Sequence, residues 1–316
     1  LIENIEVKEN PLYNQIKKES NNYIINNLYE SKEFKSKIFD INLAYWSSIC
    51  YPDIIIKDKI YNITNFYTLL FIIDDLLEND INSNLNGKRY VYILENKLEP
   101  FTVIEKTFKN VWGLIKKDLS NTQKIRFIKY IKEWIDGAEY LAKFNENIDR
   151  NTYMYYRFKS IGARSSFISI EYGLGIDFEH EILESYKEIH KIAAENIIFV
   201  NDLFSYRKEI YENKNNPNIV KIIMREKNCS LQEAIDFLEI DIKDNYKQFE
   251  ILYKKLLIKY NNNDVKKYLD GLYNLIIGNL QWSCISPRYH GVDFNNTLIN
   301  GAKVIFDKDR TIIIDN

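Results

Sequence analysis

One stretch of the chain, residues 201–209, reads Asn-Asp-Leu-Phe-Ser-Tyr-Arg-Lys-Glu. It places the amide of Asn201, the hydroxyl of Ser205 and the carboxylate of Glu209 at positions i, i+4 and i+8. On an α-helix every fourth residue is rotated by only about 40°, so the three side chains stack along one face within roughly 12 Å. Oxygen ligands of mixed charge suit Mg²⁺. The stretch therefore predicts a helix that carries one half of a magnesium site.

A second acidic cluster ends an apolar run at residues 71–80, Phe-Ile-Ile-Asp-Asp-Leu-Leu-Glu-Asn-Asp. Asp74 and Glu78 are again separated by four residues, and we expect Asp74 together with Glu78 or Asp75 to bind metal. Asp75 can alternatively turn towards a basic partner, and Asp80 falls where the helix should fray. An isolated acidic pair at a helix end is usually solvated, but two such clusters next to apolar helical sequence indicate opposite walls of one metal-filled pocket.

The remaining sequence favours helices throughout and predicts an all-α fold in a single domain, residues 1–316. Apolar side chains recur at three- and four-residue spacing, no period-two alternation is sustained, and no linker divides the chain. Residues 59–80 are apolar on nearly all sides, which predicts a central helix. Ser230 and Glu233 form a capping box that opens another helix. The other expected helices are 11–29, 33–50, 101–118, 122–146, 151–175 with a break at Gly162, 182–211 and 264–285.

Composition excludes several classes of protein. The net charge of −2 argues against a nucleic-acid binder, which would present a basic face. The three cysteines and three histidines are dispersed and form no zinc pattern. No uninterrupted apolar run is long enough to span a membrane, so we expect no stable membrane insertion and a cytoplasmic protein.

The two acidic clusters resemble the metal-binding motifs of class I terpene synthases of the microbial type. Residues 74–78 match the aspartate-rich motif in the form DDxxE, or DDxxxxD if Asp80 is counted. Residues 201–209 match NDxxSxxxE at every defined position. Three further elements occur in the family's order. They are the stretch 156–162, Lys208 before the last metal ligand, and the pair Arg288-Tyr289 near the C-terminus.

The resemblance implies a class I terpenoid synthase helical bundle around a central pocket. Such an enzyme is a carbon–oxygen lyase (cyclase) that ionises a prenyl diphosphate with about three Mg²⁺ ions, which Mn²⁺ can replace. The released diphosphate needs positive charge and hydrogen-bond donors held in place beforehand, and the resemblance assigns this role to Arg157, Lys208, Arg288 and Tyr289.

Three neighbouring assignments follow in the same stretches. The resemblance makes Ser160 the linker and Ile161 the effector beside the sensing arginine, and a helix break at Gly162 would turn a free backbone carbonyl towards an allylic cation. We expect Asp202 to act as a hydrogen-bonding support and Arg207 to face solvent.

The segment after the last long helix carries no helical spacing of its own. We therefore expect residues 286–292 to be mobile without ligand and to close the pocket when metal and diphosphate bind.

The carbocation part of the pocket must be dry and aromatic. Tyr67 and Phe71 lie two turns and one turn before Asp74, and Trp282 lies six residues before Arg288. Aromatic faces attract a cation by roughly 0.5–2 kcal/mol each. Plain core packing remains the alternative for all three rings.

Farnesyl diphosphate is the expected substrate, giving a sesquiterpene and diphosphate. The alternatives are a diterpene synthase acting on geranylgeranyl diphosphate, a chain-elongating trans-prenyltransferase and a non-enzymatic helical scaffold. An elongating enzyme normally carries a second DDxxD, which Asn201 and Ser205 replace here, and the DxDD acid of class II cyclases is absent. A homodimer is compatible with this interpretation.

Overall fold

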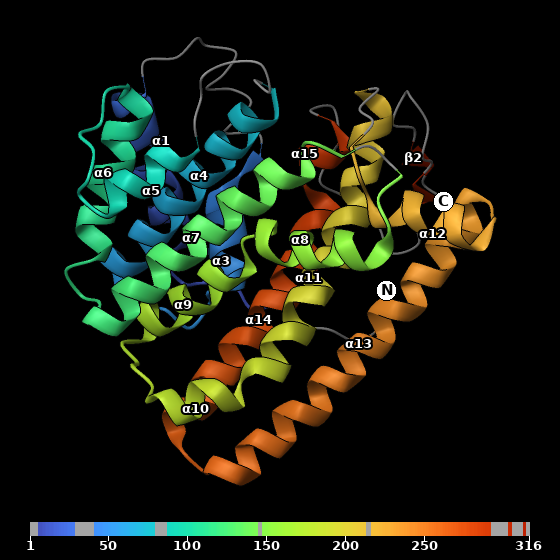
Figure 1. Cartoon of the computed structure of the whole chain (residues 1–316). Helices are drawn as coiled ribbons and strands as arrows, with labels where there is room; N and C mark the ends of the chain where they lie inside the picture. Colours follow the sequence, from blue (N-terminus) through green and yellow to red (C-terminus); the bar gives the residue numbers. More distant parts are fainter. Residues whose placement is uncertain are drawn as a thin grey trace.

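The computed structural model describes residues 6–28, 41–79, 87–144, 147–212 and 216–291, and the backbone of residues 303–304 and 312–313. The side chains of Glu78 and Asn79 lie outside the described part. Long helices dominate it, which confirms the predicted all-α class (Figure 1). The helices are α1 (Tyr13–Asn27), α3 (Leu43–Cys50), α4 (Lys57–Asn79), α5 (Lys88–Leu94), α6 (Val103–Ile115), α7 (Asn121–Leu141), α8 (Arg150–Ser160), α9 (Ala163–Leu174), α10 (His180–Ser185), α11 (Lys187–Tyr211), α12 (Ile219–Lys227), α13 (Leu231–Tyr260), α14 (Asn263–Ile285) and α15 (Pro287–His290).

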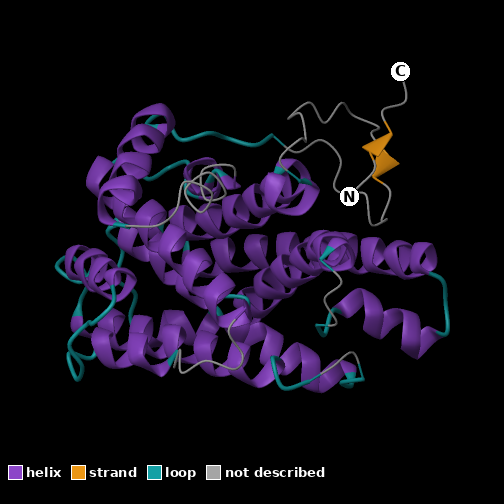
Figure 2. Cartoon of the chain, turned by 90° about the horizontal axis from the view of Figure 1, so that it is seen from above, coloured by secondary structure: helices purple, strands orange, loops and turns teal. Residues whose placement is uncertain are grey.

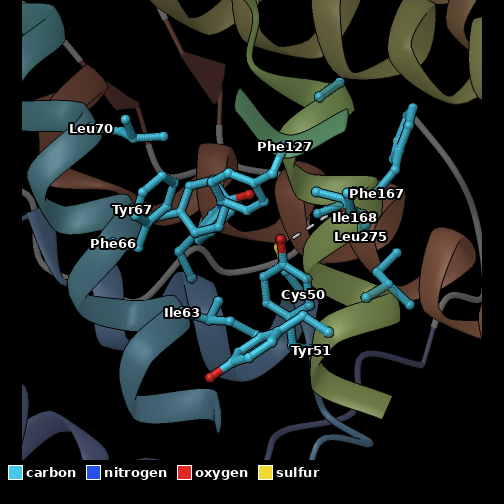
Figure 3. Packing of buried hydrophobic residues seen from close by; sticks show 14 of the residues in the cluster. Cys50, Tyr51, Ile63, Phe66, Tyr67, Leu70, Phe127, Phe167, Ile168 and Leu275 are labelled. Carbon is cyan, nitrogen blue, oxygen red and sulfur yellow. Dashed lines mark hydrogen bonds between the residues drawn. The ribbon is translucent and has the colours of Figure 1, made fainter. Parts of the chain in front are cut away.

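Helix α4 is buried along most of its length, as its apolar sequence predicts. It packs against α1, α3, α6 and α9, and its side chains Phe66 and Leu69 are fully buried. Figure 3 shows Phe66 and Tyr67 on α4 facing the cluster that includes Phe127, Phe167 and Ile168. A helix with apolar residues on every side needs such neighbours because any exposed face would leave apolar surface in water.

Helix α14 approaches α3 closely at the level of the backbone. It packs against α3 and α11, and α13 runs beside α11 (Figure 1). At Gly278 an added Cβ would lie 2.7 Å from the carbonyl oxygen of Ile49 and 2.9 Å from the nitrogen of Cys50. Only glycine fits there, so the sequence allows α3 and α14 to touch backbone to backbone.

Local signals place several helix ends. Ser230 and Glu233 form the predicted capping box, and the same arrangement opens α6 at Thr102 and α7 at Ser120. Gly162 adopts a φ of +74° between α8 and α9, which is the expected break. A left-handed residue ends α8 and lets α9 start in a new direction.

Of the four short helices, α5, α12 and α15 were not expected from the sequence, whereas α10 covers the start of the expected helix 182–211, which is interrupted at Tyr186. Each has at most nine residues, too few turns for apolar spacing to show clearly. Residues 303–304 and 312–313 form a two-residue antiparallel pairing near the C-terminus, although no sheet was expected (Figure 2). The first part of the expected helix 33–50, and Asp80, lie outside the described residues.

Two clusters of buried apolar side chains fill the described bundle. The larger spans α1 to α9 and reaches α13 and α14, and the smaller joins α8, α11, α12 and α13. Phe158, Ile161 and Phe204 pack against both clusters and connect them. In the described part of the chain, no helix combines the length and the apolar character needed to cross a bilayer.

Candidate active site

A cavity of about 480 Å³ lies among α4, α7, α8, α11 and α14. Helix α4 contributes Tyr67, Phe71 and Asp74, which follow one face at successive turns. Asp74 reaches the cavity wall as the sequence predicts. The cavity thus has a polar region, where the two acidic clusters meet, and an apolar region beside the same helix.

Helix α11 presents Asn201, Ser205 and Glu209 to this cavity along one face. The Ser205 hydroxyl donates to Oε1 of Glu209 at 3.1 Å. The other oxygen of Glu209, Oε2, is buried and has no hydrogen-bond partner in the described part of the structure. Burial, followed by repulsion from Asp202, raises the pKa of Glu209 to about 7. A buried carboxyl group with an unsatisfied oxygen is compatible with the predicted role of Glu209 as a metal ligand.

Asn218, in the segment before α12, braces this face of α11 from outside. Its Nδ2 donates to the carbonyl oxygen of Asp202 at 2.9 Å and lies 3.4 Å from both Ser205 Oγ and Glu209 Oε1. Its Oδ1 accepts from the backbone nitrogen of Val220 at 2.9 Å and caps α12. The side chain is buried, so its bonds fix two proposed metal ligands relative to the start of a separate helix.

Asp202 supports the site from beneath. It is 1% exposed and accepts hydrogen bonds from the hydroxyl of Tyr153, from Nε of Arg157 at 2.9 Å and from the nitrogen of Ile219 at 3.2 Å. These bonds fit the supporting role expected from the sequence. Burial opposes the positive charge of Arg157, but attraction to Asp202 and Tyr153 outweighs it and raises the pKa of Arg157 above its ordinary value.

The amide of Asn201 connects two proposed diphosphate-binding side chains. Its Oδ1 accepts from Nη2 of Arg157 at 2.6 Å, and its Nδ2 donates to the hydroxyl of Tyr289 at 2.8 Å. Ser160 Oγ lies 3.5 Å from Nη1 of the same arginine. Arg157, Asn201 and Tyr289 are therefore held together before any ligand is present.

Asp75 turns to basic partners, which is one of the two alternatives left open by the sequence. Arg288 donates to both of its oxygens, at 2.9 and 3.1 Å, and Nζ of Lys208 lies 3.9 Å from Oδ1. Lys208 and Arg288 also line the cavity, whereas Asp75 does not. Glu78 cannot be placed because its side chain lies outside the described part.

The segment that carries Arg288 differs from expectation. Residues 287–290 form the helical turn α15, capped by Ser286. Tyr289 is 1% exposed and packs edge-on against Trp282, with ring centroids 5.5 Å apart. The expectation of a segment with little to hold it in place is wrong for these residues, because a buried ring and the bond to Asn201 anchor it.

Arg207 is also not where the sequence suggested. It is fully buried and donates to Nδ1 of His290, whose Nε2 donates to the carbonyl oxygen of Ser283 at 3.1 Å. The guanidinium faces α15 instead of solvent since α11 and α15 pack together. This interaction ties the end of the proposed metal motif to the Arg288-Tyr289 turn.

Aromatic rings line the apolar region. Tyr67, Phe71 and Trp282 border the cavity, and Trp46 of α3 joins them. Phe71 and Trp282 meet edge-on at 5.8 Å, and Trp46 lies 4.9 Å from Tyr67. These rings are both core and cavity wall, so the two alternatives for them are not exclusive.

The expected helix break beside Arg157 occurs at Gly162. Ile161 lines the cavity, and the Gly162 carbonyl accepts from Ser165 Oγ at 2.7 Å and lies 3.3 Å from the nitrogen of Ser166. Those bonds leave it partly satisfied by the first turn of α9. The Gly162 carbonyl is therefore not the free backbone carbonyl expected at this break, and the expectation of such a group stays a prediction.

The donor set fits a hard divalent cation. In the described part of the chain, no three His, Cys, Asp or Glu side chains form a metal-binding group. The candidate ligands are instead the mixed set Asn201, Ser205 and Glu209, with Asp74 across the cavity. Oxygen donors with few charges suit Mg²⁺, which keeps several waters and shares ligands with phosphates.

Sequence patterns missed three polar contributors, Tyr153, Asn218 and Asn279. Tyr153 lies one turn before Arg157, so its position on that helical face was a usable signal. Asn218 follows Pro217 in a segment expected to be a loop, and Asn279 is a single amide in an apolar helix. Only the tertiary structure shows that Asn218 contacts Ser205 and Glu209 and that Asn279 lines the cavity.

The helix-lined cavity therefore combines an acidic wall, a basic rim and an aromatic region. The family model for terpene synthase family 2, C-terminal metal binding, matches residues 65–248, more than half of the chain. The chain therefore belongs to the terpene synthase family.

Relatives and a solved structure agree with this assignment. Microbial terpene synthase-like protein 13 of Selaginella moellendorffii is 28% identical to this chain over 59% of the chain's residues. In this match the chain spans about half (54%) of the length of that protein. Terpene cyclase 4 of Gibberella fujikuroi is 24% identical over 92% of this chain and 83% of its own. Sesquiterpene synthase 3 of Postia placenta is 23% identical over 90% of this chain and 80% of its own.

The fold is also similar to that of germacradien-4-ol synthase from Streptomyces citricolor. The TM-score is 0.75 at 17% identity, covering 90% of this chain and 97% of the solved one. At this identity the likeness concerns the fold alone.

Proposed function

We propose that this chain is a Mg²⁺-dependent terpene cyclase that ionises farnesyl diphosphate and releases a sesquiterpene and diphosphate, with residues 1–316 acting as one domain. The observation that carries the proposal is that one cavity has a polar region with two ligand sets and an apolar region lined by aromatic rings, among them Tyr67, Phe71 and Trp282. Ionisation requires charge stabilisation at one end of the substrate and exclusion of water at the other.

The polar region is suited to the leaving group. Asp74 on one side and Asn201, Ser205 and Glu209 on the other would hold Mg²⁺, which when bound would neutralise charge on the departing diphosphate. Lys208 and Arg288 line the cavity, and both pair with the carboxylate of Asp75. When the substrate binds, its phosphate oxygens would replace Asp75 as the partner of these two cations. Arg157 and Tyr289 are already positioned through Asn201.

The apolar region is suited to the hydrocarbon chain. Tyr67, Phe71 and Trp282 offer π faces or edges without acting as strong bases, and cation–π attraction contributes roughly 0.5–2 kcal/mol for each ring face. The hydroxyl of Tyr67 forms a hydrogen bond with Ser169 Oγ at 3.1 Å, so this hydroxyl would not take part in the reaction. Farnesyl diphosphate is preferred because a near-full-length relative is named a sesquiterpene synthase.

Incubation of the purified chain with geranyl, farnesyl and geranylgeranyl diphosphates tests the proposal, with product analysis by gas chromatography and assay of released diphosphate. We expect cyclic C15 products from farnesyl diphosphate, dependent on Mg²⁺ and lost in Glu209→Gln. If only geranylgeranyl diphosphate were converted, the substrate would be assigned as this diterpene precursor instead of farnesyl diphosphate. A longer prenyl diphosphate formed with added isopentenyl diphosphate would instead show an elongating enzyme, and no turnover of any substrate would refute the proposal.

A further inference from the structure

Asn279 is an isolated amide in the apolar part of the cavity. It lies on the face of α14 that also carries Leu275 and Trp282 towards the cavity, one turn from each. The residue is 7% exposed. Leu70 and Phe71 of α4 also line this cavity.

The amide has an unmade hydrogen bond. Nδ2 of Asn279 is fully buried and finds no acceptor among the residues that the structure describes. The other amide of α14 with a comparable burial, Asn274, does have a partner, because its Nδ2 donates to Oδ2 of Asp53 at 2.9 Å. Buried polar groups are nearly always bonded, so an unbonded amide nitrogen on a residue that lines a cavity points to a partner bound there.

The chemistry of the cavity restricts what that ligand can be. A prenyl chain has no hydrogen-bond acceptor, and the diphosphate belongs at the polar region beside Asn201 and Glu209. A water molecule is small enough, and the carboxamide offers it both a donor and an acceptor. Apolar cavities stay dry unless such polar partners are present.

We propose that Asn279 binds one water molecule in the apolar region and that this water captures the final carbocation, so that the main product is a terpene alcohol. This inference rests on the function proposed above. A donated Nδ2–H orients the water while leaving a lone pair for the cationic carbon. The water oxygen forms the new C–O bond, and the resulting oxonium loses a proton to the diphosphate anion released at ionisation. Prenyl diphosphate and water thus give terpene alcohol and diphosphate, with no change of oxidation state.

Turnover of farnesyl diphosphate in H₂¹⁸O with Mg²⁺ is the direct test. The wild-type chain should give a main product with one ¹⁸O atom. In Asn279→Leu, which has a similar volume, the alcohol fraction should fall by about tenfold in favour of hydrocarbons, the factor expected for one lost hydrogen bond. Diphosphate release should persist, since the ionising groups are untouched.

Asn274→Leu is the matched control on the same helix. It breaks the bond to Asp53, so its melting temperature should fall while the ratio of alcohol to hydrocarbon stays unchanged. Asn279→Leu should instead melt at the wild-type temperature or above it, because it removes an unpaired buried amide. If that variant does not fold, Asn279→Ala gives the same product readout.

The outcomes separate this inference from the proposed function. Diphosphate release with unlabelled hydrocarbons only would overturn the water site and leave the cyclase standing. An unchanged alcohol fraction in Asn279→Leu, or in Asn279→Ala if the former does not fold, would also overturn it. Absence of diphosphate release from every prenyl substrate would refute the cyclase and the water site together.

Discussion

Asp202→Asn should destabilise the protein far more than its single-atom change suggests. The Asp202 side chain is 1% exposed and pairs with Nε of Arg157 at 2.9 Å, and the arginine side chain is 19% exposed. Asparagine keeps the shape but removes the negative charge, which leaves a buried guanidinium uncompensated. It also puts an amide nitrogen where Tyr153 and the nitrogen of Ile219 now donate. Breaking a buried pair by removing one partner costs about 3–5 kcal/mol.

The assay is thermal unfolding by far-UV circular dichroism without metal. At about 2 °C per kcal/mol for a domain of this size, the melting temperature should fall by about 6–10 °C. Asp241→Asn is the control, because Asp241 pairs with Arg150 at 3.0 Å but both side chains are more than a third exposed. An exposed pair contributes about 0–1 kcal/mol. Equal, small shifts in both variants would refute the view that Asp202 is a stabilising counter-charge for Arg157.

Three further changes test other parts of the molecule. Burial, with help from nearby arginines, lowers the pKa of His190 from 6.5 to about 3, so folded protein keeps it neutral while unfolded chains protonate. The contribution of neutral His190 to the free energy of unfolding is complete above pH 6.5 and is lost by about 1.4 kcal/mol per pH unit as the pH falls towards 3. His190→Gln should therefore flatten the dependence of this free energy on pH, measured by urea titration. An unaltered slope would contradict the lowered pKa. Asn218→Ala removes a bond that positions Glu209. In the presence of inorganic diphosphate, this variant should need about ten times more Mn²⁺ for half-maximal thermal stabilisation. An unchanged Mn²⁺ concentration at the midpoint would make Asn218 only a helix cap. Phe71→Leu should increase acyclic and monocyclic products, as read by gas chromatography, and a lower melting temperature with unchanged products would make Phe71 purely a core residue.

Regular spacing made the helical fold and much of the cavity wall predictable. The i, i+4, i+8 spacing of Asn201, Ser205 and Glu209 needs only helical geometry to place them together, and the same holds for Phe71 and Asp74. The break at Gly162 was predictable because glycine, which has no Cβ, adopts a left-handed backbone angle at little cost.

Features that depend on contacts between distant segments were not predictable from the sequence. Arg207 looks like an exposed charge in its own helix, and its burial depends on His290, which is 83 residues away. The turn at Arg288 and Tyr289 is too short for periodicity, so its anchoring could be seen only from the buried ring and its bond to Asn201. Long-range pairing of this kind leaves no local pattern.

The backbone contact at Gly278 has a consequence for how this chain can diverge. Replacing one ring such as Phe71 reshapes one wall, and a single reversal restores the old product spectrum. A lineage that acquires alanine at position 278 must instead separate α3 from α14, since the new methyl group would lie within 3 Å of the Ile49 and Cys50 backbone. Trp46 and Trp282 stand on those two helices, so both would shift at once. Descendants would accumulate repacking around the wider gap, and returning to glycine would no longer recover the ancestral cavity.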